Sequence, residues 1–272
     1  MNAFLQQVMA ERRRDARLAA RRAPRAVFEA DPLWPHPRRS LRQRLAGAPG
    51  GRPAVIAELK RASPSAGLLR ADYAPADLAR LYERAGAAAI SVLTEPRHFL
   101  GRDADLQAVR RAVSLPILRK DFLSTPYQLA ESRRLGADAV LLIAAGLTGP
   151  QLALLYREAL VLGLEALIEV HTRAELERVR RLDRAILGVN SRNLSTLKTD
   201  LAIARSLAPC LPAGRPAVAE SGLRTAADIR GLQALGYRGF LIGGTLMKAA
   251  DPGQALARLL GACSPATGFR NG

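Results

Sequence analysis

The chain has 272 residues, of which 49% are apolar and only 4% aromatic, so a large core must be built mainly from aliphatic side chains. No apolar run approaches the roughly 20 residues that a membrane-spanning helix needs, and the N-terminal residues lack the order of a secretion signal, which predicts a cytoplasmic protein without a membrane partner. The net charge of +17 favours anionic partners, although the basic residues lack interleaved aromatic side chains, which argues against specific nucleic-acid binding.

The N-terminal part of the chain reads as an extension. Residues 3–22 are predicted to form one amphipathic helix, followed by a Pro- and Arg-rich connection, a short helical piece near 40–47 and a turn over 47–53. Trp34, the single tryptophan, is expected to anchor this extension rather than take part in catalysis. The apolar side of the helix includes Phe4, Leu5, Val8 and Met9.

Eight short apolar segments follow, each ending in polar residues or glycine. They span residues 54–60, 88–95, 116–122, 139–146, 165–171, 185–193, 216–222 and 239–245. Segments this short and apolar suit strands buried on both faces of a parallel sheet. The stretches between them have helical length, with Thr or Pro near the start and Gly just past the end.

Eight strand–helix units in about 200 residues predict an α/β fold, a (β/α)8 barrel. We therefore expect residues 1–50 to be an N-terminal helical extension packed on the barrel, and residues 51–272 to be the catalytic barrel domain. In this fold the active site lies where the strands end, so the residues that follow the apolar segments become the candidate site.

Charged residues occupy several of these strand ends. The first strand places Glu58 and Lys60 two apart, and therefore on one face. The third places Arg119 and Asp121 on one side and Lys120 on the other, and the period alone leaves open which set faces the interior. A mouth lined by lysines and glutamates can hold an acid and a base with pKa values shifted toward neutrality.

Glu169 is a charged residue within a strongly apolar fifth strand. A buried carboxylate is costly unless it is paired, so a structural ion pair is the alternative to a catalytic role. His171 lies beside it in sequence but is not expected to be catalytic. The cysteines, Cys210 and Cys263, and the scattered histidines have no metal-ligand spacing, so we expect no metal site.

Glycines follow the last two strands. The seventh ends in Ser221 and Gly222, and the eighth in Gly243 and Gly244. Barrels often bind phosphate at these two loops through backbone N–H groups, and glycine lets the backbone approach the anion closely. Although paired glycines also serve simple turns, their place in the strand order predicts that Gly222, Gly243 and Gly244 bind a phosphate. Together with the charged strand ends, this predicts acid–base chemistry on a small phosphorylated substrate, without a cofactor.

These motifs together resemble one known family. AELKRASPSAG, SVLTE, LPILRKDF, IEVH, GVNSRNL, AESGL and LIGGTLM occur in this order over about residues 50–260. They resemble the indole-3-glycerol phosphate synthases of tryptophan biosynthesis, which are carboxy-lyases. The first helix also resembles the N-terminal extension of this family. The resemblance implies ring closure of 1-(2-carboxyphenylamino)-1-deoxyribulose 5-phosphate, followed by loss of CO2 and water, to give indole-3-glycerol phosphate.

The resemblance also implies roles for individual residues. Lys120 would be the general acid at the substrate carbonyl, and Glu169 the general acid or base of the dehydration. The other implied residues are Glu58, Asn190 and Glu220 in catalysis, Lys60, Ser63, Arg192 and Ser221 in substrate binding, and Gly222, Gly243 and Gly244 in phosphate binding.

The chain departs from the family pattern at a few positions. Ser191 stands where the family usually has Asn, Arg102 where it often has Ser, and Gly244 where it often has Ser or Thr. These changes bear on substrate affinity rather than on the reaction class.

Two other functions are alternatives to this one. The first is a related phosphoribosyl isomerase, which would need a Cys–Asp or Asp–Asp pair. The second is a basic RNA-binding protein on a barrel scaffold. We expect a monomer or a weak homo-oligomer.

Overall fold

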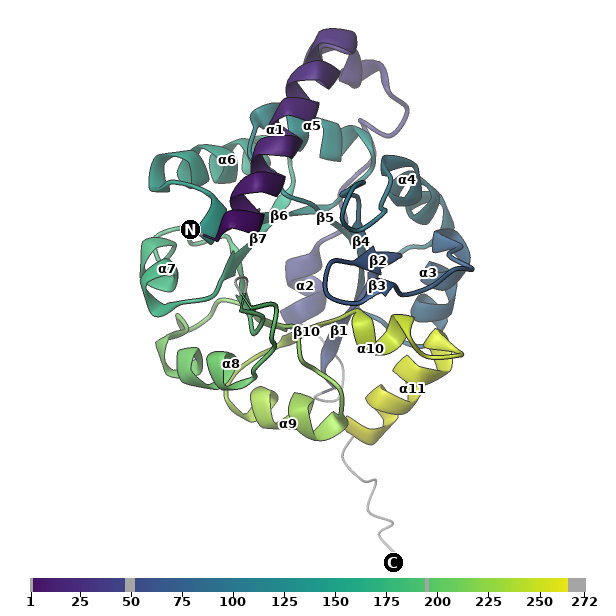
Figure 1. Cartoon of the computed structure of the whole chain (residues 1–272), viewed down its shortest axis with the longest axis vertical. Coiled ribbons are helices and arrows are strands. Elements are labelled where there is room, and N and C mark those ends of the chain that lie inside the picture. The colour runs from purple at the N-terminus through teal and green to yellow at the C-terminus, as the bar shows by residue number, and fades with distance from the viewer. Residues whose placement is uncertain (1, 47–51, 194–195, 264–272) are drawn as a thin grey trace, which may run out of the picture.

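The computed structural model describes residues 2–46, 52–193 and 196–263. Eight parallel strands close into a barrel in the order β1-β10-β9-β8-β7-β6-β5-β4 (Figure 1). The strands are β1 (Ala54–Leu59), β4 (Ala89–Leu93), β5 (Ile117–Lys120), β6 (Ala139–Ile143), β7 (Glu165–Val170), β8 (Ile186–Asn190), β9 (Ala217–Glu220) and β10 (Gly239–Ile242). Each lies within one of the eight predicted segments, so the predicted (β/α)8 barrel is confirmed.

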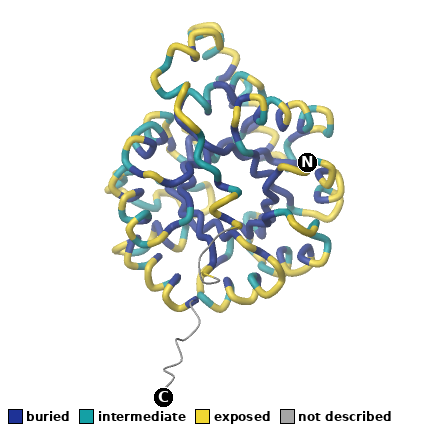
Figure 2. Tube along the Cα trace, turned by 180° about the vertical axis from the view of Figure 1, so that it is seen from behind, coloured by how far each residue is buried: buried dark blue, intermediate teal, exposed yellow. Residues whose placement is uncertain are grey.

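Helices surround the barrel and shield the apolar side chains of the strands. They are α3 (Pro75–Arg84), α4 (Asp103–Ala112), α5 (Pro126–Arg134), α6 (Gly149–Val161), α7 (Arg173–Arg178), α8 (Ala202–Leu207), α9 (Ala226–Ala234), α10 (Gly244–Met247) and α11 (Pro252–Cys263), with short 3-10 turns η3 (Ala144–Gly146) and η4 (Ala208–Cys210). The predicted N-caps are present, because the hydroxyls of Thr125, Thr148 and Thr225 each accept a backbone N–H of the first turn. Figure 2 shows buried residues gathered in the ring of strands and exposed residues on the outer rim.

The N-terminal segment covers both ends of the barrel. It forms α1 (Ala3–Arg22), η1 (Arg25–Ala30) and α2 (Leu41–Ala46). Near α2, the backbone N–H of Arg39 donates to Asp138 at 2.8 Å and the hydroxyl of Ser40 donates to Glu165 at 2.6 Å. Both acceptors lie where strands begin, so α2 closes the amino-terminal end of the barrel, whereas α1 lies over the side of the opposite end formed by β6, β7 and α5 (Figure 1).

Trp34 packs half-buried against the core, with the guanidinium of Arg133 on α5 over its ring at 4.9 Å, as expected of an anchor. The predicted turn over 47–53 falls largely outside the described residues, as does the boundary at residue 50. The division into an extension and a barrel domain therefore stays a prediction. Among the described helices, none is long and apolar enough to cross a membrane.

Candidate active site

One cavity of about 880 Å³ opens at the carboxyl ends of the strands. The short antiparallel pair β2 (Ala62–Ser63) and β3 (Gly67–Leu68), in the loop after β1, borders it. All the predicted site residues line this cavity: Glu58, Lys60, Ser63, Lys120, Glu169, Asn190, Arg192, Glu220, Ser221, Gly222, Gly243 and Gly244. The fold therefore brings together residues that are as much as 186 positions apart, from Glu58 to Gly244.

A layer of four charged side chains forms the floor of the cavity. Glu58, Lys120, Glu169 and Glu220 come from β1, β5, β7 and β9, which are alternate strands of the barrel. Alternate strands contribute side chains to the same interior layer. The ammonium of Lys120 accordingly donates to Oε2 of Glu169 and to Oε2 of Glu220, both at 3.2 Å.

The charges of this layer shift one another's pKa values. Burial disfavours the Lys120 ammonium, but the carboxylates of Glu220, Glu169 and Glu58 outweigh it and raise the pKa of Lys120 above its ordinary value. Burial also works against the Glu169 carboxylate, but Lys120, His171 and Asn190 stabilise the anion and lower its pKa. For Glu220, burial prevails and raises the pKa to about 7. Of these four groups, Lys120 is thus a cation at neutral pH, Glu169 is an anion, and Glu220 titrates near neutrality.

Two of the carboxylates pack closely against glycine residues. A methyl group at Gly243 would come within 2.2 Å of Oε1 of Glu58, the oxygen that accepts from the Lys60 ammonium at 2.5 Å. At Gly188 on β8 it would come within 2.1 Å of Oε1 of Glu220. A side chain at either position would therefore displace the carboxylate beside it. Gly243 was predicted from the sequence only as a phosphate-binding residue, and the structure adds this second constraint.

Asn190 and Arg192 shape the side of the cavity that follows β8. The side chain of Asn190 hydrogen-bonds Glu169, and its Oδ1 accepts the backbone N–H of Arg192 at 2.9 Å. The Arg192 guanidinium donates to the hydroxyl of Ser65 at 3.3 Å, which links this side to the loop after β1. That link places a cation at the mouth of the cavity, which Ser63 also lines.

The loops after β9 and β10 form the opposite rim. Ser221 and Gly222 both have a left-handed backbone, with φ of 67° and 82°, a conformation that is costly for Ser221 and accordingly typical of functional sites. Gly244 opens α10, and a methyl group there would meet nothing within 4 Å. The space beside these loops is open to a ligand. Three exposed basic residues that the sequence analysis did not single out also line it: Lys198, Arg224 and Lys248.

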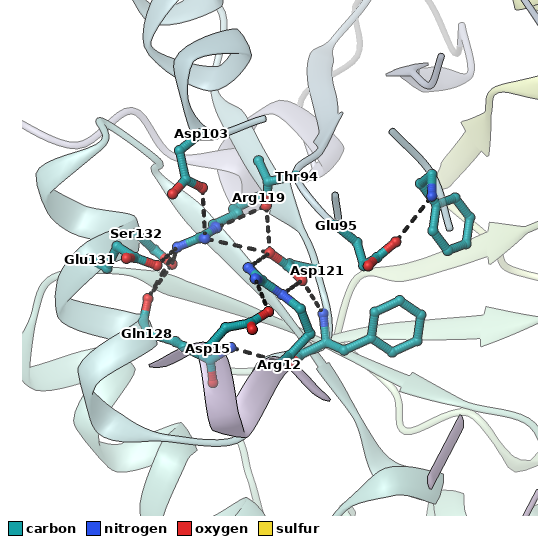
Figure 3. A network of polar contacts seen from close by, with 12 residues as sticks. Arg12, Asp15, Thr94, Glu95, Asp103, Arg119, Asp121, Gln128, Glu131 and Ser132 are labelled. Carbon is teal, nitrogen blue, oxygen red and sulfur yellow. Dashed lines mark hydrogen bonds and ion pairs between the residues drawn. The ribbon is translucent and has the colours of Figure 1, made fainter. Parts of the chain in front are cut away.

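The structure resolves the ambiguity at β5 that the sequence left open. Lys120 points into the barrel, whereas Arg119 points outward and is fully buried against the surrounding helices, where it pairs with Asp103 and Glu131 at 2.9 Å each (Figure 3). Asp121 is also buried, and Arg12 of α1 binds it. Arg119 therefore lies behind the site, whereas Asp121 belongs to the same network and also lines the cavity.

The cavity also has an apolar wall that was not predicted from the sequence. This wall includes Phe4 and Leu5 of α1, Phe99, Phe122 and Leu141. Apolar residues at strand ends give no signal that separates them from the core, although the position of Phe122 directly after Lys120 and Asp121 could have indicated it. The aromatic side chains of this wall come from α1 and from the segments after β4 and β5; β5 lies opposite β9 in the strand order, and the β9–β10 side contributes Leu223 and Leu241 to the lining.

His171 lies behind Glu169 rather than on the cavity wall. Its Nε2 is 3.4 Å from Oε1 of Glu169, and its Nδ1 is 3.6 Å from Glu175. Although burial favours the neutral ring, the two carboxylates raise the pKa of His171. Its position fits the expectation that it does not act on substrate directly. In the described part of the chain, no group of three or more His, Cys, Asp or Glu side chains is arranged to hold a metal ion.

The chain is similar to proteins of one family over most of its length. Residues 5–259 match the family model described as indole-3-glycerol phosphate synthase. A protein of that name from Carboxydothermus hydrogenoformans is 44% identical over 263 residues, covering 94% of this chain and 99% of the relative. Another from Azospirillum brasilense is 49% identical over 211 residues, covering 78% and 80%.

A solved structure shares the fold alone. Thiamine phosphate pyrophosphorylase from Pyrococcus furiosus superposes with a TM-score of 0.58 at 14% identity, covering 82% of this chain and 98% of that one. The family model, in contrast, spans nearly the whole chain, and the relatives named above share more than two fifths of its residues over the aligned lengths. This chain belongs to the indole-3-glycerol phosphate synthase family.

Proposed function

We propose that the chain converts 1-(2-carboxyphenylamino)-1-deoxyribulose 5-phosphate to indole-3-glycerol phosphate, by the acid–base groups of the cavity. The observation that carries the proposal is the buried Lys120 ammonium between Glu169 and Glu220, in a chain of this family. Lys120 is a cation at neutral pH because the surrounding carboxylates raise its pKa, so it can donate a proton.

The substrate would lie across the cavity. Its phosphate would bind at Gly222, Gly243 and Gly244, where backbone N–H groups and the basic rim favour an anion. Its aromatic ring would then reach the apolar wall on the opposite side. Lys60 and Arg192 lie at the mouth between these two ends, where they can meet the substrate's anionic groups.

Ring closure needs an acid at the carbonyl oxygen. As the aromatic carbon attacks the carbonyl carbon, Lys120 donates a proton to the oxygen, which becomes a hydroxyl group. Loss of CO2 leaves its electron pair in the ring and restores aromaticity. A positioned general acid or base typically contributes about 10²–10⁴-fold to such a step.

Dehydration needs a base and an acid. Glu169 is a carboxylate at neutral pH because Lys120 and His171 hold its pKa below the ordinary value, so it can accept the proton that the new five-membered ring loses. Glu220, with a pKa of about 7, can donate a proton to the hydroxyl group, which then leaves as water. Glu58 fixes Lys60, and Asn190 fixes Glu169.

The test is to incubate the purified chain with the substrate and follow the fluorescence of the indole product. We expect product with the wild-type chain and a large loss with Lys120→Ala at an unchanged circular dichroism spectrum. A folded wild-type chain that forms no product would overturn the proposal. Location in the cytoplasm, a monomeric or weakly associated state and the lack of a specific nucleic-acid partner stay predictions.

A further inference from the structure

Arg12 is a buried charge on the inner face of α1. Its guanidinium binds the carboxylate of Asp121 through two hydrogen bonds, Nε to Oδ1 at 2.9 Å and Nη2 to Oδ2 at 2.6 Å (Figure 3). The two residues are 109 positions apart. Such a forked contact fixes orientation as well as distance, so it sets how α1 sits on the barrel.

Asp121 connects α1 to two strands. Its Oδ2 accepts from the hydroxyl of Thr94, just past β4, at 2.7 Å, and that hydroxyl accepts from Nε of Arg119 on β5 at 3.0 Å (Figure 3). Its Oδ1 accepts the backbone N–H of Phe122 at 2.8 Å. The Asp121 carboxylate is therefore held on every side, and it fixes the backbone that directly follows Lys120.

Residues of the cavity flank this contact on both partners. Lys120 and Phe122, the neighbours of Asp121, line the cavity. On α1, Leu5 precedes Arg12 by seven residues, about two helical turns, so the two side chains share one face. Leu5 and its neighbour Phe4 line the same cavity. One ion pair thus joins the helix that supplies part of the apolar wall to the strand end that supplies the lysine.

Stability alone gives a weak reason for such a pair. Desolvation of two buried charges offsets most of their attraction, and apolar replacements are often as stable. The inner face of α1 already packs through apolar residues such as Val8 and Met9. An ion pair adds a defined position of one element relative to the other. Here it fixes α1 relative to the end of β5, and residues of both line the substrate cavity.

We propose that Arg12 is a positioning residue for the reaction: through Asp121 it holds the wall formed by Phe4 and Leu5 at a fixed place opposite the phosphate loops, so that the substrate's aromatic ring lies within reach of Lys120. This inference rests on the proposed function. It assigns Arg12 to the ring end of the substrate and not to its phosphate end.

The variant Arg12→Gln tests this assignment, with Arg14→Gln as the control, since Arg14 is an exposed arginine of the same helix. At a temperature well below unfolding, we expect Arg12→Gln to raise KM about tenfold and to weaken competitive inhibition by anthranilate similarly. Inhibition by inorganic phosphate should stay within twofold of wild type, because the phosphate loops are on the far side. Arg14→Gln should change none of these values.

A double-mutant cycle separates positioning from general loss of structure. Asp121→Asn should weaken binding at the ring end at least as much as Arg12→Gln, because it also disturbs the contacts with Thr94 and Phe122. The double variant should be little worse than Asp121→Asn alone, because the Arg12 contact is already broken in that variant. Arg12→Lys, which keeps the charge but loses the fork, should fall between wild type and Arg12→Gln, and it decides the question if Arg12→Gln does not fold.

Kinetic constants within twofold of wild type in the folded Arg12 variant would overturn the inference, as would equal weakening of phosphate and anthranilate, or additive effects in the double variant. Each of these outcomes presupposes an active wild-type chain. Lack of activity in the wild type would instead overturn the proposed function.

Discussion

Lys120 keeps its proton in a buried place where an isolated lysine would lose it. Glu169 and Glu220 each lie 3.2 Å from its ammonium. Because one ammonium lies beside two carboxylates, one of the two carboxyl groups can be protonated at little cost in free energy. Glu220 is that group, with a pKa of about 7, and this makes the layer a reservoir for proton transfer at neutral pH.

The acid and the base can be removed separately. Lys120→Ala and Glu169→Gln should each lower kcat by about 10²–10⁴-fold, because each takes away one proton-transfer group. Steady-state kinetics by indole fluorescence, with circular dichroism to verify the fold, measures this. If folded Lys120→Ala retained near-normal kcat, its assignment as the general acid would be wrong.

Glu220 also predicts how stability depends on pH. The folded state raises its pKa from 4.5 to about 7, so the folded chain binds this proton more tightly than the unfolded chain does. Between these values, ionisation of Glu220 lowers the free energy of unfolding as the pH rises, by an amount on the order of 1–3 kcal/mol. Glu220→Gln removes this contribution, so its melting temperature relative to wild type should be higher at pH 8 than at pH 5.

The control for this comparison is Glu169→Gln. Glu169 has a lowered pKa, and its carboxylate therefore stabilises the fold at neutral pH and loses this effect only in acid. Glu169→Gln should consequently show a smaller gain in relative stability between pH 5 and pH 8 than Glu220→Gln, and that gain comes only from the lower pKa of Glu220 once Glu169 is neutral. A Glu220→Gln variant whose relative melting temperature fell over that range would contradict the assigned ionisation.

Among the elements, the junction of β10 and α10 contains two consecutive glycines, Gly243 and Gly244, with different roles. Gly243 makes room for the Glu58 carboxylate, whereas Gly244 faces open space in the cavity. Gly243→Val should therefore displace Glu58 and Lys60 and lower kcat. Gly244→Val should place its side chain where the phosphate binds and raise KM, about tenfold or more, with a smaller change in kcat.

Kinetics of the two variants with the phosphorylated substrate distinguish these effects, and Gly244→Ala gives an intermediate test of the space beside the loop. An unchanged KM in Gly244→Val would remove Gly244 from the phosphate site. An unchanged kcat in Gly243→Val would show that Glu58 and Lys60 tolerate displacement, contrary to the role proposed for them.

Most helices and strands could be predicted from the sequence because each has a strong local pattern. The strands were evident from their short apolar runs, and the caps at Thr125, Thr148 and Thr225 from the residue types that helices prefer. The short pair β2–β3 was not evident, because its strands have only two residues each and depend on tertiary contacts. The direction of Lys120 was also undetermined, since alternation gives two faces but not which one is inside.

At the scale of the whole molecule, closure of the barrel supplies what local patterns lack. The order of the strands puts β1, β5, β7 and β9 in one interior layer and sets the glycine loops opposite α1. The charged layer could be inferred once a barrel was assumed. The pairing of Arg12 with Asp121 could not, because no periodicity relates a helix in the extension to the end of a strand 109 residues later.

The whole chain carries a large excess of positive charge, with 41 Lys and Arg against 24 Asp and Glu. We expect most of this excess to act as solvated charge that steers an anionic substrate toward the mouth. Binding to an unstructured RNA should be weak at physiological salt and should fall steeply as salt increases, because it rests on counterion release. Fluorescence anisotropy with labelled RNA from 50 to 300 mM salt measures this, with labelled DNA of the same length as the control. Tight binding that resisted salt and discriminated between sequences would instead establish a nucleic-acid partner, whereas a loss of affinity that is equal for RNA and DNA would leave the phosphorylated small molecule as the anion that this charge serves.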